Sequence, residues 1–209
     1  MAKKTQKFPE VTVDGLELVK QSKSGVVYAK PGASLATYKQ VKLLAPAVAF
    51  KKNWERDQRH SNSITAKRLS PKDIDKIKTT LATEFNIVFT KTLEEAGYEL
   101  TDEIAEDVMI IRPAIINLDV NAPNAGSNSR DRVYVDSAGE MTLYLELYDS
   151  ATSDLIVKAM SRKADNAFGG FYTWANSSTN KIAAEKILSG WAKILVNALN
   201  ESKSIRPAE

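Results

Sequence analysis

One stretch decides the fold: residues 70–97, SPKDIDKIKTTLATEFNIVFTKTLEEAG. Its first residues are typical of a helix start, with Ser70 as the N-cap and Pro71 at the first helical position. Gly97 supplies the left-handed residue that commonly follows a helix. Between them, apolar residues recur at three- and four-residue steps: Ile74, Ile77, Leu81, Phe85, Val88 and Phe89. The spacing predicts a long amphipathic helix over 71–96, whose apolar stripe must be covered by a sheet or another helix.

A second amphipathic helix is predicted over residues 179–200, with Ser177 or Ser178 as its N-cap. Its apolar stripe consists of Ala184, Ile187, Leu188, Trp191, Leu195, Ala198 and Leu199. This helix also needs a covered face, and the simplest arrangement places both helices on the same side of one sheet.

Four apolar segments predict the strands of that sheet. Residues 38–50 and 108–120 are apolar runs that contain Pro46 and Pro113. Pro46 implies an edge, a bulge or a strand break, and Pro113 implies a bulge or an unpaired edge. Apolar and polar residues alternate over 141–148, and 155–162 returns as the antiparallel partner. We therefore predict an α+β fold in the order β-α-β-β-β-α. Its mixed, mostly antiparallel sheet would have four or five strands, with two long helices packed on one face.

The remaining segments frame this unit. We expect a flexible basic arm over 1–10, a single α+β domain over 11–201, and a flexible tail over 202–209. Residues 11–37 form a strand extension at the N-terminal side of the domain. Residues 51–69 have no clear period and predict a surface loop. Residues 121–139 form a second polar loop, whose length indicates either a function or disorder.

Composition excludes much of the usual chemistry. The 209 residues contain no cysteine and one histidine, His60. Most thiol nucleophiles, thiolate metal sites and imidazole bases are thereby removed, and no phosphate-binding glycine loop or catalytic triad replaces them. The net charge of +3 is too small to indicate a nucleic-acid binder, and no apolar run is long enough to span a membrane. We expect no cofactor.

The amino terminus leaves two compartments open. Residues 1–10 are basic but lack the apolar region that a signal peptide requires. The protein is therefore either cytoplasmic, or exported with its signal removed. The absence of cysteine fits both, and it means that any lipidated cysteine of a precursor is not in this chain.

Several polar residues have both a catalytic and an ordinary interpretation. His60 with nearby Asp57 could act as an oriented base, although a lone histidine in a polar loop is more often solvated. Two sets of acidic residues could hold a hard cation: Asp149 with Asp154, and Asp102 with Glu103, Glu106 and Asp107. Neither set has the residue spacing of a calcium-binding loop, and hydrogen bonds within a turn explain Asp149 and Asp154. We favour the ordinary interpretation and expect no metal site.

Basic residues cluster in two places. The functional interpretation is peripheral contact with an anionic surface, and the simpler one is a solvated surface, because acidic residues balance the charge overall. The clusters are Lys3, Lys4 and Lys7, and then Lys51, Lys52, Arg56, Arg59, Lys67 and Arg68.

The most unusual short segment spans residues 168–174 and has four aromatic residues around two glycines. Such a loop can form a contact surface for a partner, or its aromatic rings can close the end of the sheet. We hypothesise an interaction surface formed by Phe168, Gly169, Gly170, Phe171, Tyr172 and Trp174.

The chain resembles a family of bacterial envelope proteins, many of them described as lipoproteins, known as domain of unknown function 3313. The resemblance covers about residues 15–200. It is carried by residues 38–50, Trp54, the helix from Ser70 to Tyr98, residues 110–118, residues 139–149, and Trp191-Ala192. It implies a periplasmic or outer-membrane-associated location and supplies no activity or site residues.

Two functions remain. The first is a non-enzymatic envelope protein that binds a protein partner or a cell-envelope polymer through its loops. The second is a hydrolase or transferase that uses carboxylates, with Asp57, His60 or Asp149 as candidates. The lack of a converging nucleophile, base and orienting group favours the first.

Overall fold

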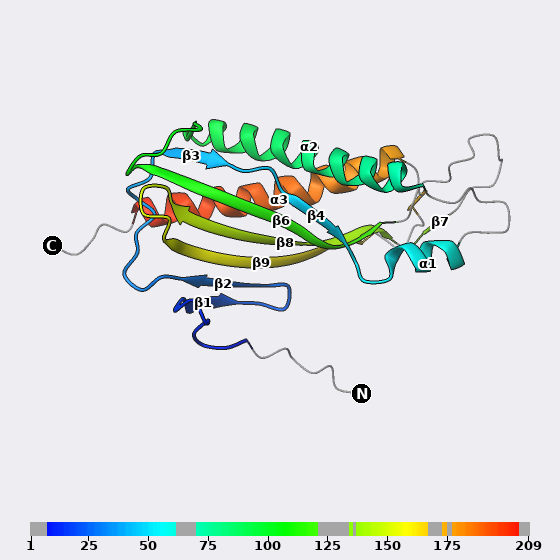
Figure 1. The fold of residues 1–209 in the computed structure, drawn as a ribbon, viewed down its shortest axis with the longest axis horizontal. Coiled ribbons are helices and arrows are strands. Elements are labelled where there is room, and N and C mark those ends of the chain that lie inside the picture. Colours follow the sequence, from blue (N-terminus) through cyan, green and yellow to red (C-terminus); the bar gives the residue numbers. More distant parts are fainter. Residues whose placement is uncertain are drawn as a thin grey trace.

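The computed structural model describes residues 8–61, 70–120, 134–135, 137–166, 173–174 and 177–204 (Figure 1). Its helices are α1 (Trp54–Ser61), α2 (Pro71–Glu95) and α3 (Ser177–Ser204). Its main sheet contains β1 (Glu17–Gln21), β2 (Gly25–Ala29), β3 (Gln40–Leu43), β4 (Ala47–Phe50), β5 (Glu99–Leu100), β6 (Val108–Val120), β8 (Ser137–Asp149) and β9 (Leu155–Asn166). A separate two-stranded sheet pairs β7 (Tyr134–Val135) with β10 (Thr173–Trp174).

The predicted fold class is confirmed. The eight strands of the main sheet follow the order β1-β2-β9-β8-β6-β3-β5, and β4 pairs with β6 farther along. In the main sheet that the described residues form, three strand pairs are parallel: β3–β6, β4–β6 and β3–β5. Four are antiparallel: β6–β8, β8–β9, β9–β2 and β2–β1. All six predicted elements are present. The N-terminal hairpin β1–β2 adds to the sheet beside β9, which makes the sheet wider than the four or five strands expected.

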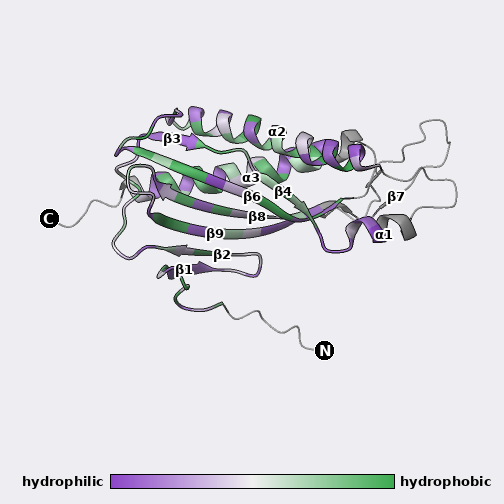
Figure 2. Ribbon diagram, viewed as in Figure 1, coloured by the Kyte–Doolittle hydropathy of each residue, from purple (hydrophilic) through white to green (hydrophobic). Residues whose placement is uncertain are grey.

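Both long helices cover the same face of the sheet, as the sequence predicted (Figure 1). Phe85 of α2 is fully buried, and Trp191 of α3 is 3% exposed. The alternate residues Leu143, Leu145 and Leu147 of β8 belong to the same buried core. Hydrophilic and hydrophobic residues alternate along α2 in Figure 2, as expected of a helix with one buried stripe.

The N-terminus of α2 has the predicted cap. The Ser70 hydroxyl accepts a hydrogen bond from the Asp73 amide at 3.3 Å, and the Asp73 carboxylate accepts one from the Ser70 amide at 2.8 Å. At the other end Gly97 has a φ of 85°. These contacts satisfy backbone groups that the ends of a helix otherwise leave unpaired.

Pro113 is neither at an edge nor in a bulge, which corrects the sequence-based expectation. It lies buried inside β6 and opposite Leu145 of β8. On the other side, the register that pairs Ala47 with Ala114 places Pro46 beside it, in the break between β3 and β4. Neither proline has an N–H group that could donate to the neighbouring strand. The pairing with β6 is therefore interrupted at the position where the two prolines lie side by side.

The bulge of β6 instead occurs at Asn117, which has a φ of 52°. The pairing with β8 advances three residues on β6, from Ile116 to Asp119, for two on β8. This extra residue keeps both Ile115 and Leu118 buried although they are three residues apart.

Two boundaries differ from the prediction. The segment expected as a loop over 51–69 contains α1, and α3 continues to Ser204 rather than ending near residue 200. In the parts of the chain that the structure describes, no helix has the length and apolar character needed to cross a membrane.

Candidate functional site

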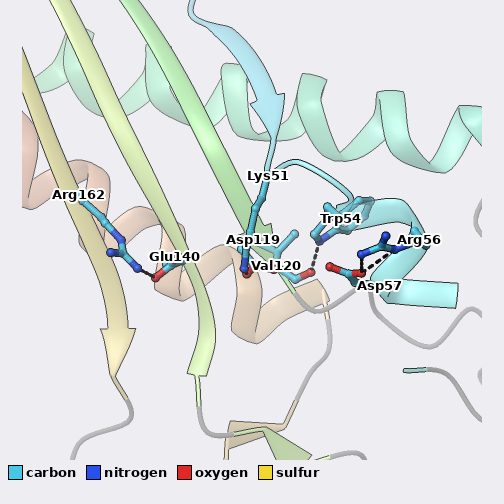
Figure 3. Close-up of polar contacts among 8 residues, drawn as sticks. All are labelled: Lys51, Trp54, Arg56, Asp57, Asp119, Val120, Glu140 and Arg162. Carbon is cyan, nitrogen blue, oxygen red and sulfur yellow. Dashed lines mark hydrogen bonds and ion pairs between the residues drawn. The ribbon is translucent and has the colours of Figure 1, made fainter. Parts of the chain in front are cut away.

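Helix α1 is held at one end of the sheet by Trp54, which is 2% exposed. Its indole ring stacks on Phe50 with ring centres 3.9 Å apart. Its Nε1 donates to the Val120 carbonyl at 2.9 Å, as Figure 3 shows. Val120 is the last residue of β6, so α1 is fixed beside the end of the central strand. This helix was not predicted from the sequence, because the Val120 carbonyl that anchors it lies 66 residues away in the chain.

Two residues of the predicted basic cluster, Lys51 and Arg56, form ion pairs at this end of the sheet. Lys51 Nζ lies 2.6 Å from a carboxylate oxygen of Asp119, which raises the pKa of Lys51 (Figure 3). Arg56 pairs with Asp57 at 3.1 Å. Lys52 is exposed, and the side chain of Arg59 lies outside the described residues. Lys67 and Arg68 lie outside the described residues, and the predicted contact with an anionic surface stays a prediction.

The same end of the sheet gathers two segments that are far apart in sequence. Residue Thr173 is paired with Val135, and Trp174 with Tyr134, in the two-stranded sheet of β10 and β7. β7 directly precedes β8, whose first residues pair with the end of β6 and the end of β9. We call this end, made of α1, β7, β10 and the adjoining ends of β6, β8 and β9, the loop end.

The loop end contains only part of the predicted interaction surface. Trp174 lies in β10 opposite Tyr134, which was not part of the predicted interaction surface. Phe168, Gly169, Gly170, Phe171 and Tyr172 lie outside the described residues, as do residues 121–133. Their assignment to an interaction surface stays a prediction.

The candidates for carboxylate chemistry are not brought together. Asp149 pairs with Met109 at the beginning of β6, whereas α1, with Asp57 and His60, lies at its end. A strand of 13 residues separates these ends by about 40 Å. The side chain of His60 lies outside the described residues.

Asp149 is occupied by its own turn. Its carboxylate accepts hydrogen bonds from the Thr152 amide and from the Tyr38 hydroxyl, each at 2.8 Å. These bonds lower the pKa of Asp149, and burial together with the carboxylate raises the pKa of Tyr38. Asp154 pairs with Lys30 at 2.7 Å. The turn interpretation therefore accounts for the bond from Thr152, whereas the contacts with Tyr38 and Lys30 join the same turn to distant segments of the chain.

The face of the sheet opposite the helices contains a polar cluster that sequence reasoning missed. The hydroxyls of Tyr144 and Tyr148 each donate to a different oxygen of Glu146 at 2.8 Å. Arg112 lies 3.6 Å from the same carboxylate. Beside it, Lys158 pairs with Asp14 of the N-terminal segment. The alternation in β8 places these polar residues on one face, but their mutual satisfaction leaves no free base or nucleophile among them.

Within the described residues, no three histidine, cysteine, aspartate or glutamate side chains lie close enough together to hold a metal ion. The acidic run Asp102, Glu103 and Glu106 is solvent-exposed in the connection between β5 and β6. Neither predicted carboxylate group forms such a cluster.

The comparisons with known proteins agree with the resemblance. A family model described as "protein of unknown function (DUF3313)" matches residues 12–195. No curated protein matches the chain.

Solved structures with a similar chain trace are distant. Protein XCC0632 from Xanthomonas campestris is 11% identical, with a TM-score of 0.42, and covers 84% of this chain and 93% of its own. The PelC dodecamer from Paraburkholderia phytofirmans is 15% identical, with a TM-score of 0.39 and coverages of 79% and 96%. A minor lipoprotein from Acinetobacter baumannii is 7% identical, with a TM-score of 0.32 and coverages of 77% and 94%.

Proposed function

The chain belongs to the DUF3313 family of proteins of unknown function, and from this membership we propose that it is a non-enzymatic protein of the bacterial envelope, periplasmic or outer-membrane-associated. It binds a protein partner or a cell-envelope polymer through the loop end. The family resemblance supports the location, and the geometry of the loop end supports the binding role.

One observation carries the binding role: the pairing of β7 with β10. It brings Trp174 opposite Tyr134, although 39 residues separate them in the chain. Tyrosine and tryptophan are the residues that contribute most often to binding energy at protein interfaces. The backbone register of this small sheet therefore brings two aromatic residues together at the same end of the main sheet as α1, which supports a contact surface there.

A binding role fits the described polar groups better than catalysis does. Asp149 lies at the other end of the sheet from Asp57 and is bound by its turn. Asp57 itself is paired with Arg56. Catalytic sites need a nucleophile, a base and an orienting group in one place, and these residues do not supply that combination.

The test compares Trp174→Ala and Tyr134→Ala with Val13→Ala, a control at a fully exposed residue of the N-terminal segment. Binding of each variant to a cell-envelope polymer is measured by sedimentation with purified cell-wall sacculi. Binding to a protein partner is measured by cross-linking in an envelope extract. We expect both aromatic variants to lose binding by tenfold or more, with melting temperatures within a few degrees of the wild type. Binding equal to that of Val13→Ala would refute the loop end as the contact surface.

Location is tested separately by fractionating cells that express a tagged full-length protein from its own gene. We expect the protein in the periplasmic or outer-membrane fraction. Recovery only with a cytoplasmic marker would refute the envelope location while leaving the binding result intact.

A further inference from the structure

Residues 8–15, which we call the strap, precede β1 and lie on the face of the sheet opposite the helices. Phe8 packs against a small apolar cluster on that face, and Asp14 pairs with Lys158 of β9. Within the strap, Phe8 and Thr12 are partly buried, whereas the other residues are exposed, Val13 completely. Because the strap buries little apolar surface, little free energy opposes its release from the sheet.

Two side chains of the sheet hold the strap. The Tyr28 hydroxyl donates to the Pro9 carbonyl at 3.1 Å, and the Lys158 ammonium donates to the Asp14 carboxylate. Tyr28 and Lys158 lie opposite each other on β2 and β9, so both contacts come from one place on the sheet. The hydrogen bond with Asp14 raises the pKa of Lys158, which keeps the ammonium charged. Among the described residues, the other hydrogen bonds of the strap lie within residues 10–18.

The strap and the group that receives it carry opposite charges. Residues 8–19 contain Glu10, Asp14 and Glu17 and no lysine or arginine. The Lys158 side chain is 21% exposed while it is paired with the strap. The strap is thus an acidic segment with an apolar first residue, and its sequence shows which chemistry this part of the sheet accepts.

Removing the strap leaves an excess of positive charge on the sheet. In the register of the strands, Arg112 of β6 and Lys158 of β9 lie opposite Glu146 of β8, one on each side. The Glu146 carboxylate already accepts two tyrosine hydroxyls at 2.8 Å, and Arg112 lies 3.6 Å from it with 65% of its side chain exposed. One carboxylate therefore faces two cations, and a further carboxylate is needed to balance Lys158.

We propose that the strap is an autoinhibitory contact, in which Asp14 occupies the place of an acidic residue from an extended peptide segment of a partner. The partner's carboxylate pairs with Lys158, and an apolar side chain takes the place of Phe8. Because the strap is tethered beside this site, it competes at a high effective concentration, and the partner binds tightly only after the strap is displaced. Leu16, at 2% exposure, stays buried, so β1 and β2 keep their places when the strap leaves.

The first test measures strap release in the full chain. The sequence has no cysteine, so nitroxide labels can be attached at two exposed sites, Val13→Cys in the strap and Ile194→Cys on α3. Double electron–electron resonance measures the distances between the labels. We expect a narrow distribution in the labelled parent chain and a broad one when Asp14→Asn removes the ion pair.

Glu10→Gln is the matched control. It removes the same charge from an exposed strap residue that forms no ion pair within the described residues, so the distribution should stay narrow. Equal distributions in the parent chain and in Asp14→Asn would show that the ion pair does not hold the strap, which overturns the proposal. Equal broadening by Glu10→Gln also overturns it, because net charge alone would then release the strap.

The second test measures binding by fluorescence anisotropy, with a fluorescein-labelled peptide of residues 8–15 as the probe. We expect Asp14→Asn to bind this peptide tenfold or more tightly than the wild type and Glu10→Gln do. Adding Lys158→Met to Asp14→Asn should abolish the gain. A peptide with asparagine in place of its aspartate should also show no gain, and it tests the same contact without altering the fold.

Equal binding of the peptide by the wild type and by Asp14→Asn refutes the autoinhibitory contact. A gain that persists without Lys158, or without the aspartate of the peptide, refutes the assigned ion pair. Polyglutamate that binds Asp14→Asn as tightly as the peptide does would rule out a peptide segment as the occupant in favour of an acidic polymer. Asp14 and Lys158 lie outside the loop end, so none of these outcomes bears on binding there.

Discussion

At the residue scale, Asp149 shows how one carboxylate connects distant segments. It accepts from Tyr38, 111 residues earlier in the chain, and from Thr152 within the β8–β9 turn. It therefore ties the segment before β3 to the turn that closes the central hairpin. Hydrogen bonds to a charged acceptor contribute more than those between neutral groups.

We predict that Asp149→Asn lowers the free energy of unfolding by about 1–2 kcal/mol at pH 7. The pKa of Asp149 is lowered in the folded state, so its contribution is complete above the unfolded pKa of about 4 and is lost as pH falls through the folded pKa. The difference between wild type and variant should therefore shrink below about pH 4. Urea denaturation of wild type and Asp149→Asn at pH 7 and pH 3 measures this difference in unfolding free energy. A difference that is the same at both pH values would contradict the role given to the charged carboxylate.

A sequence reveals individual residues when their partners are local. Ser70 and Asp73 could be predicted as a cap because they are three residues apart and their bonds stay within one turn. Trp54 could not, because its burial depends on Phe50 and on the Val120 carbonyl across the sheet end. The pairing of Tyr134 with Trp174 is likewise invisible without the register of β7 and β10.

At the element scale, the helices could be predicted because their signals are local, whereas breaks and bulges in the strands depend on distant partners. The stripes of α2 and α3 and the alternation in β8 are periodic, so their existence and buried faces followed from spacing. Pro113 was wrongly expected at an edge or bulge, because its accommodation depends on the break around Pro46 in a neighbouring strand. The real bulge, at Asn117, depends on pairing with β8, which spacing alone does not specify.

The interior of α3 contains a glycine, and we predict that Gly190→Ala stabilises the protein by about 1 kcal/mol. A Cβ there would meet only the Lys163 Nζ, at 2.8 Å. That atom ends a flexible side chain whose burial lowers its pKa, so moving it toward water should be favourable. Thermal melts of the variant measure the effect. If Gly190→Ala destabilises the wild type but not a Lys163→Met background, the ammonium group is fixed in place and the prediction is wrong.

At the scale of the whole molecule, the chain has two hydrophobic cores of unequal size. The larger lies between the sheet and the two long helices. The smaller lies on the opposite face, where Leu16, Val26 and Tyr28 are buried with Phe8, Leu18, Leu155 and Met160 packed against them. The N-terminal segment reaches this face through the Tyr28 hydroxyl, which donates to the Pro9 carbonyl at 3.1 Å. Because the smaller core depends mainly on the N-terminal hairpin, we expect it to open separately.

We predict that amide hydrogens of β1 and β2 exchange with solvent through local opening, whereas those of β6 and β8 exchange only on global unfolding. Leu16 is 2% exposed at the centre of the smaller core, and Leu16→Ala should weaken that core by about 2–4 kcal/mol. Exchange of β2 followed by mass spectrometry should then accelerate strongly, and exchange of β6 should barely change. The control is Leu145→Ala in the larger core, which should accelerate exchange in both regions together because it lowers global stability. Equal acceleration of β2 and β6 by Leu16→Ala would mean that the hairpin and the main sheet unfold as one cooperative unit.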